Sequence, residues 1–218
     1  MTDTLPDSPD AELLLATGCT HCGIVLEGLS QLLKEGLLGQ LQITNIATRP
    51  QRAEQLNVRS VPWIRLGPFI LEGQHSPAEL RKWAQRANSL EGMSTYIAEE
   101  LTLGNLNKLI ELLAQSPQQL AALIPLLENE ETEMQVRLGV DAILDSVEDK
   151  AQLARLIPDF AQLALHTNPR IRTDVSYYLA LTGSPDAIPV LKKLLEDESE
   201  EIRESATEGL QRLGDTDS

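Results

Sequence analysis

The stretch Cys19-Thr20-His21-Cys22 holds the only two cysteines of the 218-residue chain, three positions apart. An apolar run over residues 12–16 predicts a strand before it, and the leucine spacing over residues 24–33 predicts a helix after it. Backbone N–H groups and the dipole at a helix N-terminus favour the reactive thiolate of a nearby cysteine. Cys22 is then close enough to attack a mixed disulfide formed by Cys19, so the pair predicts dithiol–disulfide exchange.

The same cysteine spacing also occurs in half of a zinc site. A closed zinc site needs four ligands, and beside the cysteines the chain offers only His21, His75 and His166. We therefore expect no metal and no cofactor. We also expect Cys19 and Cys22 to be catalytic rather than buried, inert thiols.

The residues that follow predict a small α/β domain. Residues 41–46 predict a second strand, and residues 51–56 a short helix. Val61-Pro62 opens a third strand, a fourth follows the Gly67-Pro68 turn, and a last helix begins near Ser76-Pro77. This βαβαββα order, with C-x-x-C after the first strand and Val-Pro before the third, resembles the thioredoxin family over roughly residues 11–88.

The resemblance, together with the position of His21 beside Cys19, implies roles for five residues. Cys19, Cys22 and Pro62 occupy the family's motif positions, so Cys19 is expected to attack and Cys22 to resolve. Pro62 is expected to follow a cis peptide bond, and Val61 to offer its N–H and C=O to an extended substrate. His21 is expected to stabilise the Cys19 thiolate and so make the disulfide more oxidising.

This sequence also departs from the family pattern. Only a short polar tail precedes the first strand, so we expect the minimal, glutaredoxin-like form of the fold. Leu13 stands where thioredoxins carry a buried acid for proton transfer, which argues against a fast thioredoxin-type reductase. Trp63 and Trp83 are predicted to lie in the core of this domain.

After Asn88 the strand patterns end, and leucines at three- and four-residue spacing predict helices throughout. Successive isoleucines are 33 and 31 residues apart in three similar segments, Ile124-Pro125, Ile157-Pro158 and Ile188-Pro189. Each is followed by a branched apolar residue and an arginine that open a second helix, at Val136-Arg137, Ile171-Arg172 and Ile202-Arg203. Such a period, with two helices in each unit, predicts an α-solenoid.

The early proline, the acidic turn at residues 196–201 and the Ile-Arg pair resemble short HEAT repeats over roughly residues 118–214. Tetratricopeptide repeats are the alternative, but their aromatic consensus is missing. The resemblance implies that the three arginines form a structural ladder. The predicted fold class is α/β plus all-α, with a flexible tail at 1–10, a thioredoxin-like domain at 11–90, capping helices at 91–117 and a HEAT-like α-solenoid at 118–218.

The charge is unevenly divided. Residues 1–90 have 9 Asp and Glu against 8 Lys and Arg, whereas residues 91–218 have 24 against 10, which leaves nearly all of the net charge of −15 on the second half. An acidic surface argues against nucleic acid and anionic membranes as partners. It suits a basic protein partner, although solvated helix faces would give the same composition.

The N-terminus shows no secretory signal, and no apolar run reaches the roughly 18 residues of a membrane span. We therefore expect a cytoplasmic protein, where a two-cysteine motif is more often catalytic than structural. The sequence makes no prediction of oligomeric state.

Two functional hypotheses follow. The first is a thiol–disulfide oxidoreductase whose helical repeats bind its protein partner or substrate. The second is a redox-sensing chaperone or scaffold, in which the repeats bind clients and the thiols are regulatory. The second hypothesis is similar in architecture to bacterial chaperones that join a thioredoxin domain to helical repeats.

Overall fold

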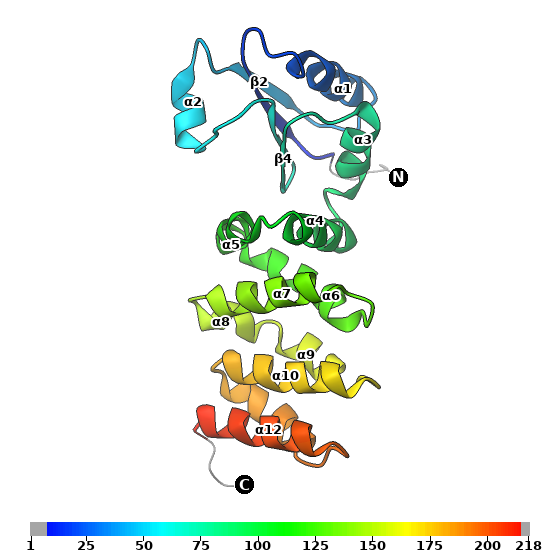
Figure 1. Ribbon diagram of the computed structural model, residues 1–218, viewed down its shortest axis with the longest axis vertical. Helices are drawn as coiled ribbons and strands as arrows, with labels where there is room; N and C mark the ends of the chain where they lie inside the picture. Colours follow the sequence, from blue (N-terminus) through cyan, green and yellow to red (C-terminus); the bar gives the residue numbers. More distant parts are fainter. Residues whose placement is uncertain (1–7, 215–218) are drawn as a thin grey trace, which may run out of the picture. The chain divides into compact units, whose positions relative to one another are not determined.

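The computed structural model describes residues 8–214, and its contacts divide the chain into two compact units, one ending at Met93 and the other beginning at Ser94 (Figure 1). Residues 1–7 of the expected tail and residues 215–218 of the expected solenoid lie outside the described residues. The elements of the first unit are β1 (Ala11–Leu15), α1 (Cys22–Lys34), β2 (Leu41–Asn45), α2 (Pro50–Gln55), β3 (Trp63–Leu66), β4 (Phe69–Glu72) and α3 (Pro77–Arg86).

The first unit is built on a mixed sheet of four strands in the order β2-β1-β3-β4. Strand β1 pairs with β2 in parallel and with β3 in antiparallel orientation, and β4 pairs antiparallel to β3. The predicted order of strands and helices is therefore confirmed. A parallel pair needs a crossover, which α1 supplies between β1 and β2.

Strand β1 is buried on both faces, because α1 and α3 pack together on one side of the sheet and α2 lies on the other (Figure 1). Leu14 packs with Trp63 and with Ala53 of α2. Gly28 lets α1 approach α3, since a Cβ there would lie 2.9 Å from Leu80 Cδ1. Trp63 is 4% exposed and Trp83 is 5% exposed, so the prediction that both belong to the core is confirmed.

Residues 8–10 belong to the folded unit, unlike the flexible tail expected for them. Ser8 Oγ donates a hydrogen bond to the carbonyl of Gly36 at 2.8 Å. The backbone N–H groups of Gly39 and Gly67 donate to the carbonyls of Pro9 and Asp10 at 3.0 and 2.8 Å. These bonds satisfy loop groups that would otherwise need solvent.

One charged side chain of β1 is buried. Glu12 is 7% exposed, and both of its carboxylate oxygens accept hydrogen bonds from Arg52 of α2, at 2.5 and 2.7 Å. A paired carboxylate costs far less to bury than an isolated one. Glu12 also raises the pKa of Arg52, mainly through this hydrogen bond.

Within its described residues, the regular secondary structure of the second unit is all helical. Its elements are α4 (Leu90–Thr102, which begins within the first unit), α5 (Leu106–Gln115), η1 (Pro117–Leu123), α6 (Ile124–Glu128), α7 (Met134–Ser146), α8 (Lys150–Ala154), α9 (Ile157–Leu163), α10 (Pro169–Leu181), η2 (Pro185–Ala187), α11 (Ile188–Leu194) and α12 (Glu200–Arg212). The expected domain boundary at residues 89–92 falls at the start of α4.

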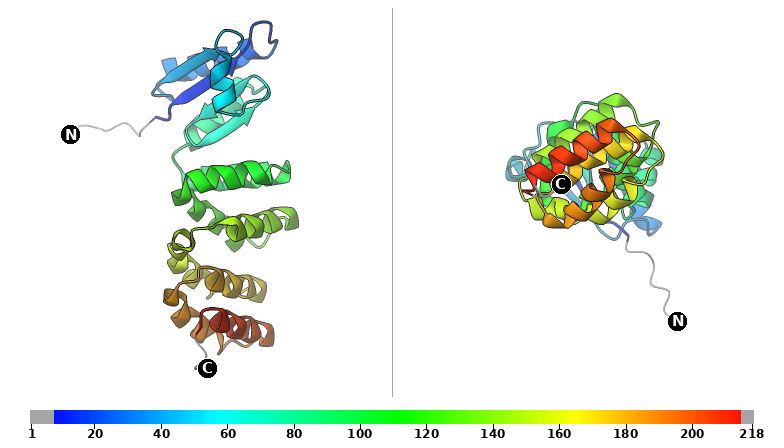
Figure 2. Two further views of the ribbon diagram at one scale, coloured as in Figure 1. Left: turned by 90° about the vertical axis from the view of Figure 1, so that its left-hand side faces the viewer. Right: turned by 90° about the horizontal axis from the view of Figure 1, so that it is seen from below.

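The repeat predicted from the sequence is visible in the helix limits. Each Ile-Pro pair begins a short first helix, namely α6, α9 and α11. Each apolar-Arg pair lies in the first turn of a second helix of 13 residues, namely α7, α10 and α12. In the left-hand view of Figure 2 these second helices, preceded by α4, lie in one stack.

The arginines of the second helices form the predicted ladder. Arg137 donates to the carbonyl of Asn129 at 2.9 Å and lies 3.6 Å from Asp174 of the following repeat. Arg172 donates to both carboxylate oxygens of Asp197, at 2.7 and 2.9 Å. Arg203 closes its own turn at the carbonyl of Asp197, at 2.7 Å. The ladder satisfies turn carbonyls and, through Arg137 and Arg172, links each repeat to the next.

Helix α4 packs against α7 within the second unit. Gln135 Nε2 donates to the carbonyl of Leu101 at 2.9 Å, which satisfies an oxygen at the end of α4. A Cβ at Gly139 would lie 2.4 Å from Leu101 Cδ2, so a larger residue there would force the buried Leu101 side chain to move. The contact continues the stack of second helices to α4.

Candidate functional site

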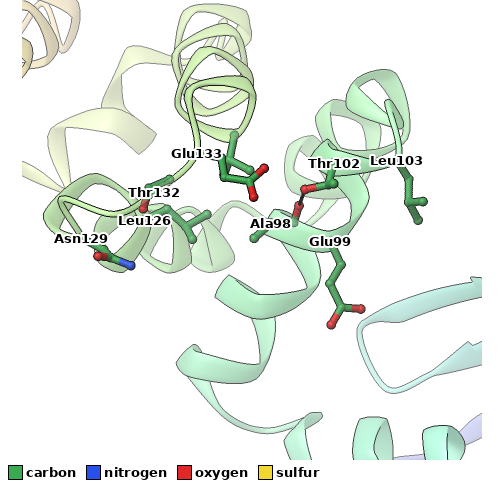
Figure 3. Close-up of a pocket in the computed structure, with 9 residues that line it drawn as sticks. Ala98, Glu99, Thr102, Leu103, Leu126, Asn129, Thr132 and Glu133 are labelled. Carbon is green, nitrogen blue, oxygen red and sulfur yellow. Dashed lines mark hydrogen bonds between the residues drawn. The ribbon is translucent and has the colours of Figure 1, made fainter.

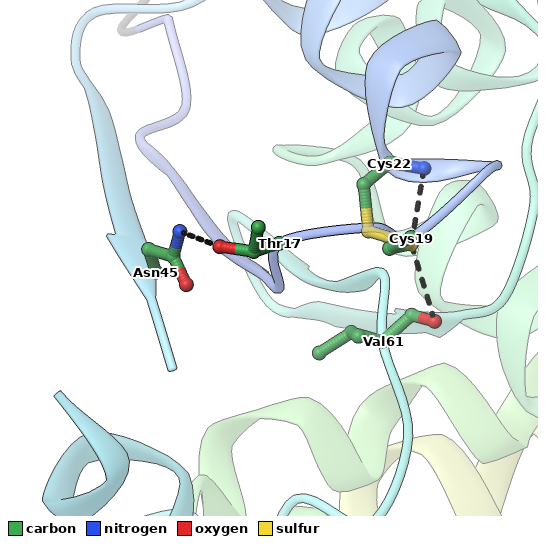
Figure 4. The surroundings of a disulfide bond; sticks show 5 residues. All are labelled: Thr17, Cys19, Cys22, Asn45 and Val61. Atoms are coloured by element: carbon green, nitrogen blue, oxygen red, sulfur yellow. Dashed lines mark hydrogen bonds between the residues drawn. A yellow bond between two sulfur atoms is a disulfide. The ribbon is translucent and has the colours of Figure 1, made fainter. Parts of the chain in front are cut away.

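A disulfide bond connects Cys19 and Cys22, whose Cα atoms are 5.5 Å apart (Figure 4). Helix α1 begins at Cys22 with His21 as its N-cap residue. Cys22 is therefore the first residue of the helix that the leucine spacing predicts after the cysteine pair. Cys19 occupies the turn between β1 and the helix.

The two cysteines differ in exposure. Cys22 is 4% exposed, whereas Cys19 is half-buried. In thiol–disulfide exchange, the thiolate sulfur must contact the disulfide sulfur that it attacks, so both sulfurs must be accessible. Cys19 is therefore the sulfur more open to a second molecule.

A backbone donor of α1 points at the accessible sulfur. The N–H of Cys22 donates a hydrogen bond to Cys19 Sγ, with 3.2 Å between nitrogen and sulfur. This N–H belongs to the group of donors that a helix leaves unpaired at its start. Donation to sulfur stabilises a negative charge there, so the geometry favours the Cys19 thiolate when the bond is reduced.

The loop before β3 supplies the other wall of the site. The Val61–Pro62 peptide bond is cis, as expected, and the carbonyl oxygen of Val61 lies 3.9 Å from Cys19 Sγ (Figure 4). Pro62 is buried, and its carbonyl accepts a hydrogen bond from Gly73 N–H at 2.9 Å. Segments 42 residues apart in sequence thus meet at the sulfur.

The turn that carries Cys19 is held by two hydrogen bonds, one of them to the sheet. Asn45 Nδ2, at the end of β2, donates to Thr17 Oγ1 at 3.2 Å (Figure 4). The N–H of Cys19 donates to the carbonyl of Ala16 at 3.2 Å. These contacts position the segment independently of the disulfide.

His21 is placed differently from the two cysteines. Its side chain is exposed and makes no capping hydrogen bond. The structure brings Cys19, Cys22, Val61 and Pro62 together, but it shows no hydrogen bond from His21 to either sulfur. The role of His21 in stabilising the thiolate remains a prediction.

A second feature, which the sequence analysis missed, is a pocket of about 500 Å³ in the repeat unit. It lies between the C-terminal end of α4 and the turn that joins α6 to α7 (Figure 3). Its lining includes Ala98, Leu103, Leu126 and Glu133. The acidic sequence at residues 128–133 and the exposed Leu103 were the available signals, but only the fold brings them together.

No group of three or more His, Cys, Asp and Glu residues within 8–214 is arranged to hold a metal ion. Within the same residues, no helix is both long enough and apolar enough to cross a membrane.

Comparison with protein families matches residues 120–211 to HEAT repeats. Residues 120–211 are HEAT repeats. The match contains all three Ile-Pro segments and all three ladder arginines, so the predicted resemblance is confirmed for this part of the chain. HEAT repeats typically mediate protein interactions. A search of curated proteins found no match to the chain.

Proposed function

We propose that this protein is a thiol–disulfide oxidoreductase whose HEAT repeats bind the protein on which its cysteines act. The observation that carries the proposal is the Cys19–Cys22 pair, with a helix N–H on the more accessible sulfur and the less accessible sulfur directly behind it. We also propose that it acts in the cytoplasm, where a two-cysteine motif is more often catalytic than structural.

The first unit is proposed to be a minimal thioredoxin-like domain. Three features support this assignment: the β2-β1-β3-β4 strand order, the cysteine pair after β1 and the cis peptide before β3. The match to HEAT repeats does not cover this unit, so the assignment rests on topology and motif position.

The proposed reaction begins with attack by the Cys19 thiolate on one sulfur of a substrate disulfide. A Cys19–substrate bond forms, the substrate disulfide breaks, and the second substrate sulfur leaves as a thiolate that takes up a proton. Cys22 then attacks Cys19 Sγ, which forms the Cys19–Cys22 bond and releases the first substrate sulfur. The substrate gains two electrons, and a dithiol reductant restores the cysteine pair. The reverse sequence oxidises a substrate dithiol.

Val61 and Pro62 are proposed to position the substrate. An extended peptide beside this loop can pair with the N–H and C=O of Val61, as an added strand pairs with a sheet edge. Pro62 fixes the direction of the loop next to the sulfur, and its own carbonyl is already paired with Gly73. Substrate selection by sequence is then left mainly to the repeats.

The test is a trapping experiment with the full chain. Cys22→Ser should accumulate a mixed disulfide between Cys19 and a protein substrate, because the resolving thiol is absent. A dithiol reductant should release the adduct, and mass spectrometry should place the bond at Cys19. Cys19→Ser is the matched control and should trap little. Equal trapping by the two variants would contradict the assigned roles.

The HEAT-repeat match favours a second candidate, a binding protein whose thiols regulate client release. The double variant Cys19→Ser/Cys22→Ser separates the two functions. If the repeats alone bind the trapped substrate, the double variant should retain its affinity but lose exchange activity. An affinity that depends on the oxidation state of the wild-type pair would support the regulatory function instead.

A further inference from the structure

The pocket between α4 and the α6–α7 turn, hereafter the α4–α7 pocket, has mostly apolar walls. Ala98 and Leu126 face it from opposite sides (Figure 3), and Val136, which has 4% of its surface exposed, also belongs to the lining. Leu103 stands at the end of α4 with 72% of its surface exposed. A volume of about 500 Å³ is within the range of ordinary ligand pockets.

The polar groups of the pocket include carboxylates but no cation. Glu99 and Glu133 belong to the lining, together with neutral hydroxyl and amide groups, and no Lys or Arg does. The carboxylate of Glu133 makes no hydrogen bond or ion pair within the described residues. Figure 3 shows it extending from the turn toward α4.

The turn that carries Glu133 is held in place by Arg137, one of the ladder arginines. Arg137 is 5% exposed and donates to the carbonyl of Asn129 at 2.9 Å, at the other end of the turn. Its own backbone N–H donates to the carbonyl of Glu133 at 3.0 Å. The backbone that carries Glu133 is therefore held in place, while its exposed carboxylate is available to a ligand.

We propose that the α4–α7 pocket binds an arginine side chain from an extended, basic segment of a partner protein. The aliphatic part of arginine fits the apolar walls of Leu103 and Leu126, and its guanidinium can pair with Glu133. The net charge of −14 over residues 91–218 favours the approach of such a segment. This inference rests on the proposed binding role of the repeats and specifies which residue type they recognise.

The test uses the full chain and a fluorescein-labelled peptide, glycine-leucine-arginine-leucine-glycine amide, with binding followed by fluorescence anisotropy. A second peptide replaces arginine by citrulline, which keeps the shape but removes the charge. The arginine peptide should bind more tightly. Glu133→Gln should weaken it by up to about fivefold, the range of a solvent-exposed ion pair, and should reduce the preference over citrulline.

Glu131→Gln is the matched control, because it removes the same charge from the same turn. Glu131 is exposed and does not line the pocket. This substitution should leave the affinity nearly unchanged. Ala98→Phe, which fills the pocket without altering charge, should abolish binding while the circular dichroism spectrum stays that of the wild type.

Three outcomes would overturn the proposal: no binding of the arginine peptide, equal binding of the citrulline peptide, or equal loss in Glu131→Gln and Glu133→Gln. The last would mean that the acidic surface attracts peptides without a defined pocket. Each can occur while Cys22→Ser still traps a substrate through Cys19, so failure here is distinguishable from failure of the proposed oxidoreductase.

Discussion

The two units of this protein place their functional groups in opposite ways. In the first unit, four neighbouring residues and one loop carbonyl make the site, and the sulfur receives a backbone N–H rather than a charged side chain. In the second unit, the α4–α7 pocket is assembled from α4, which precedes the HEAT repeats, and from the α6–α7 turn, which a buried arginine holds. A single substitution can therefore remove chemistry from the first unit without affecting its core, whereas in the second it can disturb a repeat and its neighbour.

The tryptophans provide a direct way to observe this difference. Both Trp63 and Trp83 lie in the first unit, while the second unit is helical over its described residues. Tryptophan fluorescence thus reports mainly on the first unit, and helical circular dichroism mainly on the second.

The largest expected effect is the loss of exchange activity in Cys19→Ser. The variant removes the attacking sulfur, so reduction of a small disulfide should fall to the uncatalysed rate. The unfolding transitions followed by tryptophan fluorescence and by circular dichroism should both remain. Hydrogen bonds at Thr17 and Ala16 hold the turn that carries residue 19 without the disulfide. Stopped-flow absorbance gives the rate. Residual activity in Cys19→Ser that disappears in the double serine variant would make Cys22 the attacking residue.

The second prediction concerns the ladder. Arg172 and Asp197 side chains are each 9% exposed, and Arg172 also donates to the carbonyls of His166 and Thr167. Removing one partner of a buried ion pair costs about 3 kcal/mol or more, because the other charge stays buried. Arg172→Met should therefore lower the free energy of unfolding measured by circular dichroism.

The control for the ladder prediction is Arg155→Met, at an exposed arginine of the same unit. It should change the unfolding free energy by less than about 0.5 kcal/mol. Tryptophan fluorescence should show little change in either variant. A shift of the fluorescence transition as large as that of the circular dichroism would mean that the units unfold together.

The third prediction uses the pH dependence of the same contact. Hydrogen bonds from Arg172, the largest cause, hold the pKa of Asp197 below its usual value. The stability that the ionised Asp197 contributes is fully present above the pKa of about 3.9 that an aspartate has in the unfolded chain. This stability is lost as the pH falls through the lower pKa of Asp197 in the folded protein. The stability difference between wild type and Asp197→Asn should therefore be constant above about pH 4. It should shrink as the pH falls below that value.

The comparison between variants is needed because a neighbouring carboxyl acts in the opposite sense. Burial, and then the charge of Asp141, raise the pKa of Asp174. Its contribution is greatest at low pH and is lost as pH rises through the raised folded pKa. The wild type and Asp197→Asn both contain Asp174, so its effect cancels in the difference between their stabilities. A difference that persists unchanged at the lowest pH would contradict the assignment to Asp197.

Much of the first unit was predictable because its signals are local. The apolar run of β1, the cysteine spacing and the Val61-Pro62 pair each occupy a few adjacent residues, and the element order they predict is the one observed. The start of α1 at Cys22 was not predictable in the same way, because apolar periodicity marks a helix face better than its first residue. The burial of Glu12 was missed, because its partner Arg52 is 40 residues away.

The second unit shows a different limit. Repetition of the Ile-Pro and Ile-Arg pairs was sufficient to predict the helix pairs and the arginine ladder. The α4–α7 pocket was not predictable, because α4 lacks the repeat signature and its contact with α7, through Leu101 on Gly139 and the hydrogen bond from Gln135, arises from tertiary packing. Features shared by all repeats are visible in a sequence, whereas a feature found at a single interface is not.

A smaller effect is expected from the acidic residues of α12. Glu200, Glu201 and Glu204 are exposed, so any ion pair that they form with a partner is open to solvent. Reversing all three to Lys should weaken capture of a basic substrate several-fold at low salt, since each exposed pair is worth less than about 1 kcal/mol. Raising the salt should remove the difference.

Exchange with a small neutral disulfide should be unaffected by the reversals, because the sulfur lies in the other unit. Reversal of exposed acids in the first unit, such as Glu27→Lys with Glu54→Lys, serves as the control. If capture is indifferent both to salt and to the α12 reversals, these acids only solvate the helix, and recognition depends on the apolar and arginine-bearing surfaces.

The smallest expected effect belongs to His21. Its side chain is exposed and has no capping hydrogen bond, so any influence on Cys19 acts through solvent rather than through direct contact. His21→Ala should lower the reduction potential by less than about 30 mV, which corresponds to about 1.4 kcal/mol for a two-electron couple. Thr20→Ala, at the other residue between the cysteines, controls for a change in turn flexibility. The potentials are measured by equilibration with glutathione. A fall well beyond 30 mV for His21→Ala alone would show that the imidazole contacts the sulfur in the reduced protein, and the site would then depend on a side chain as the repeats do.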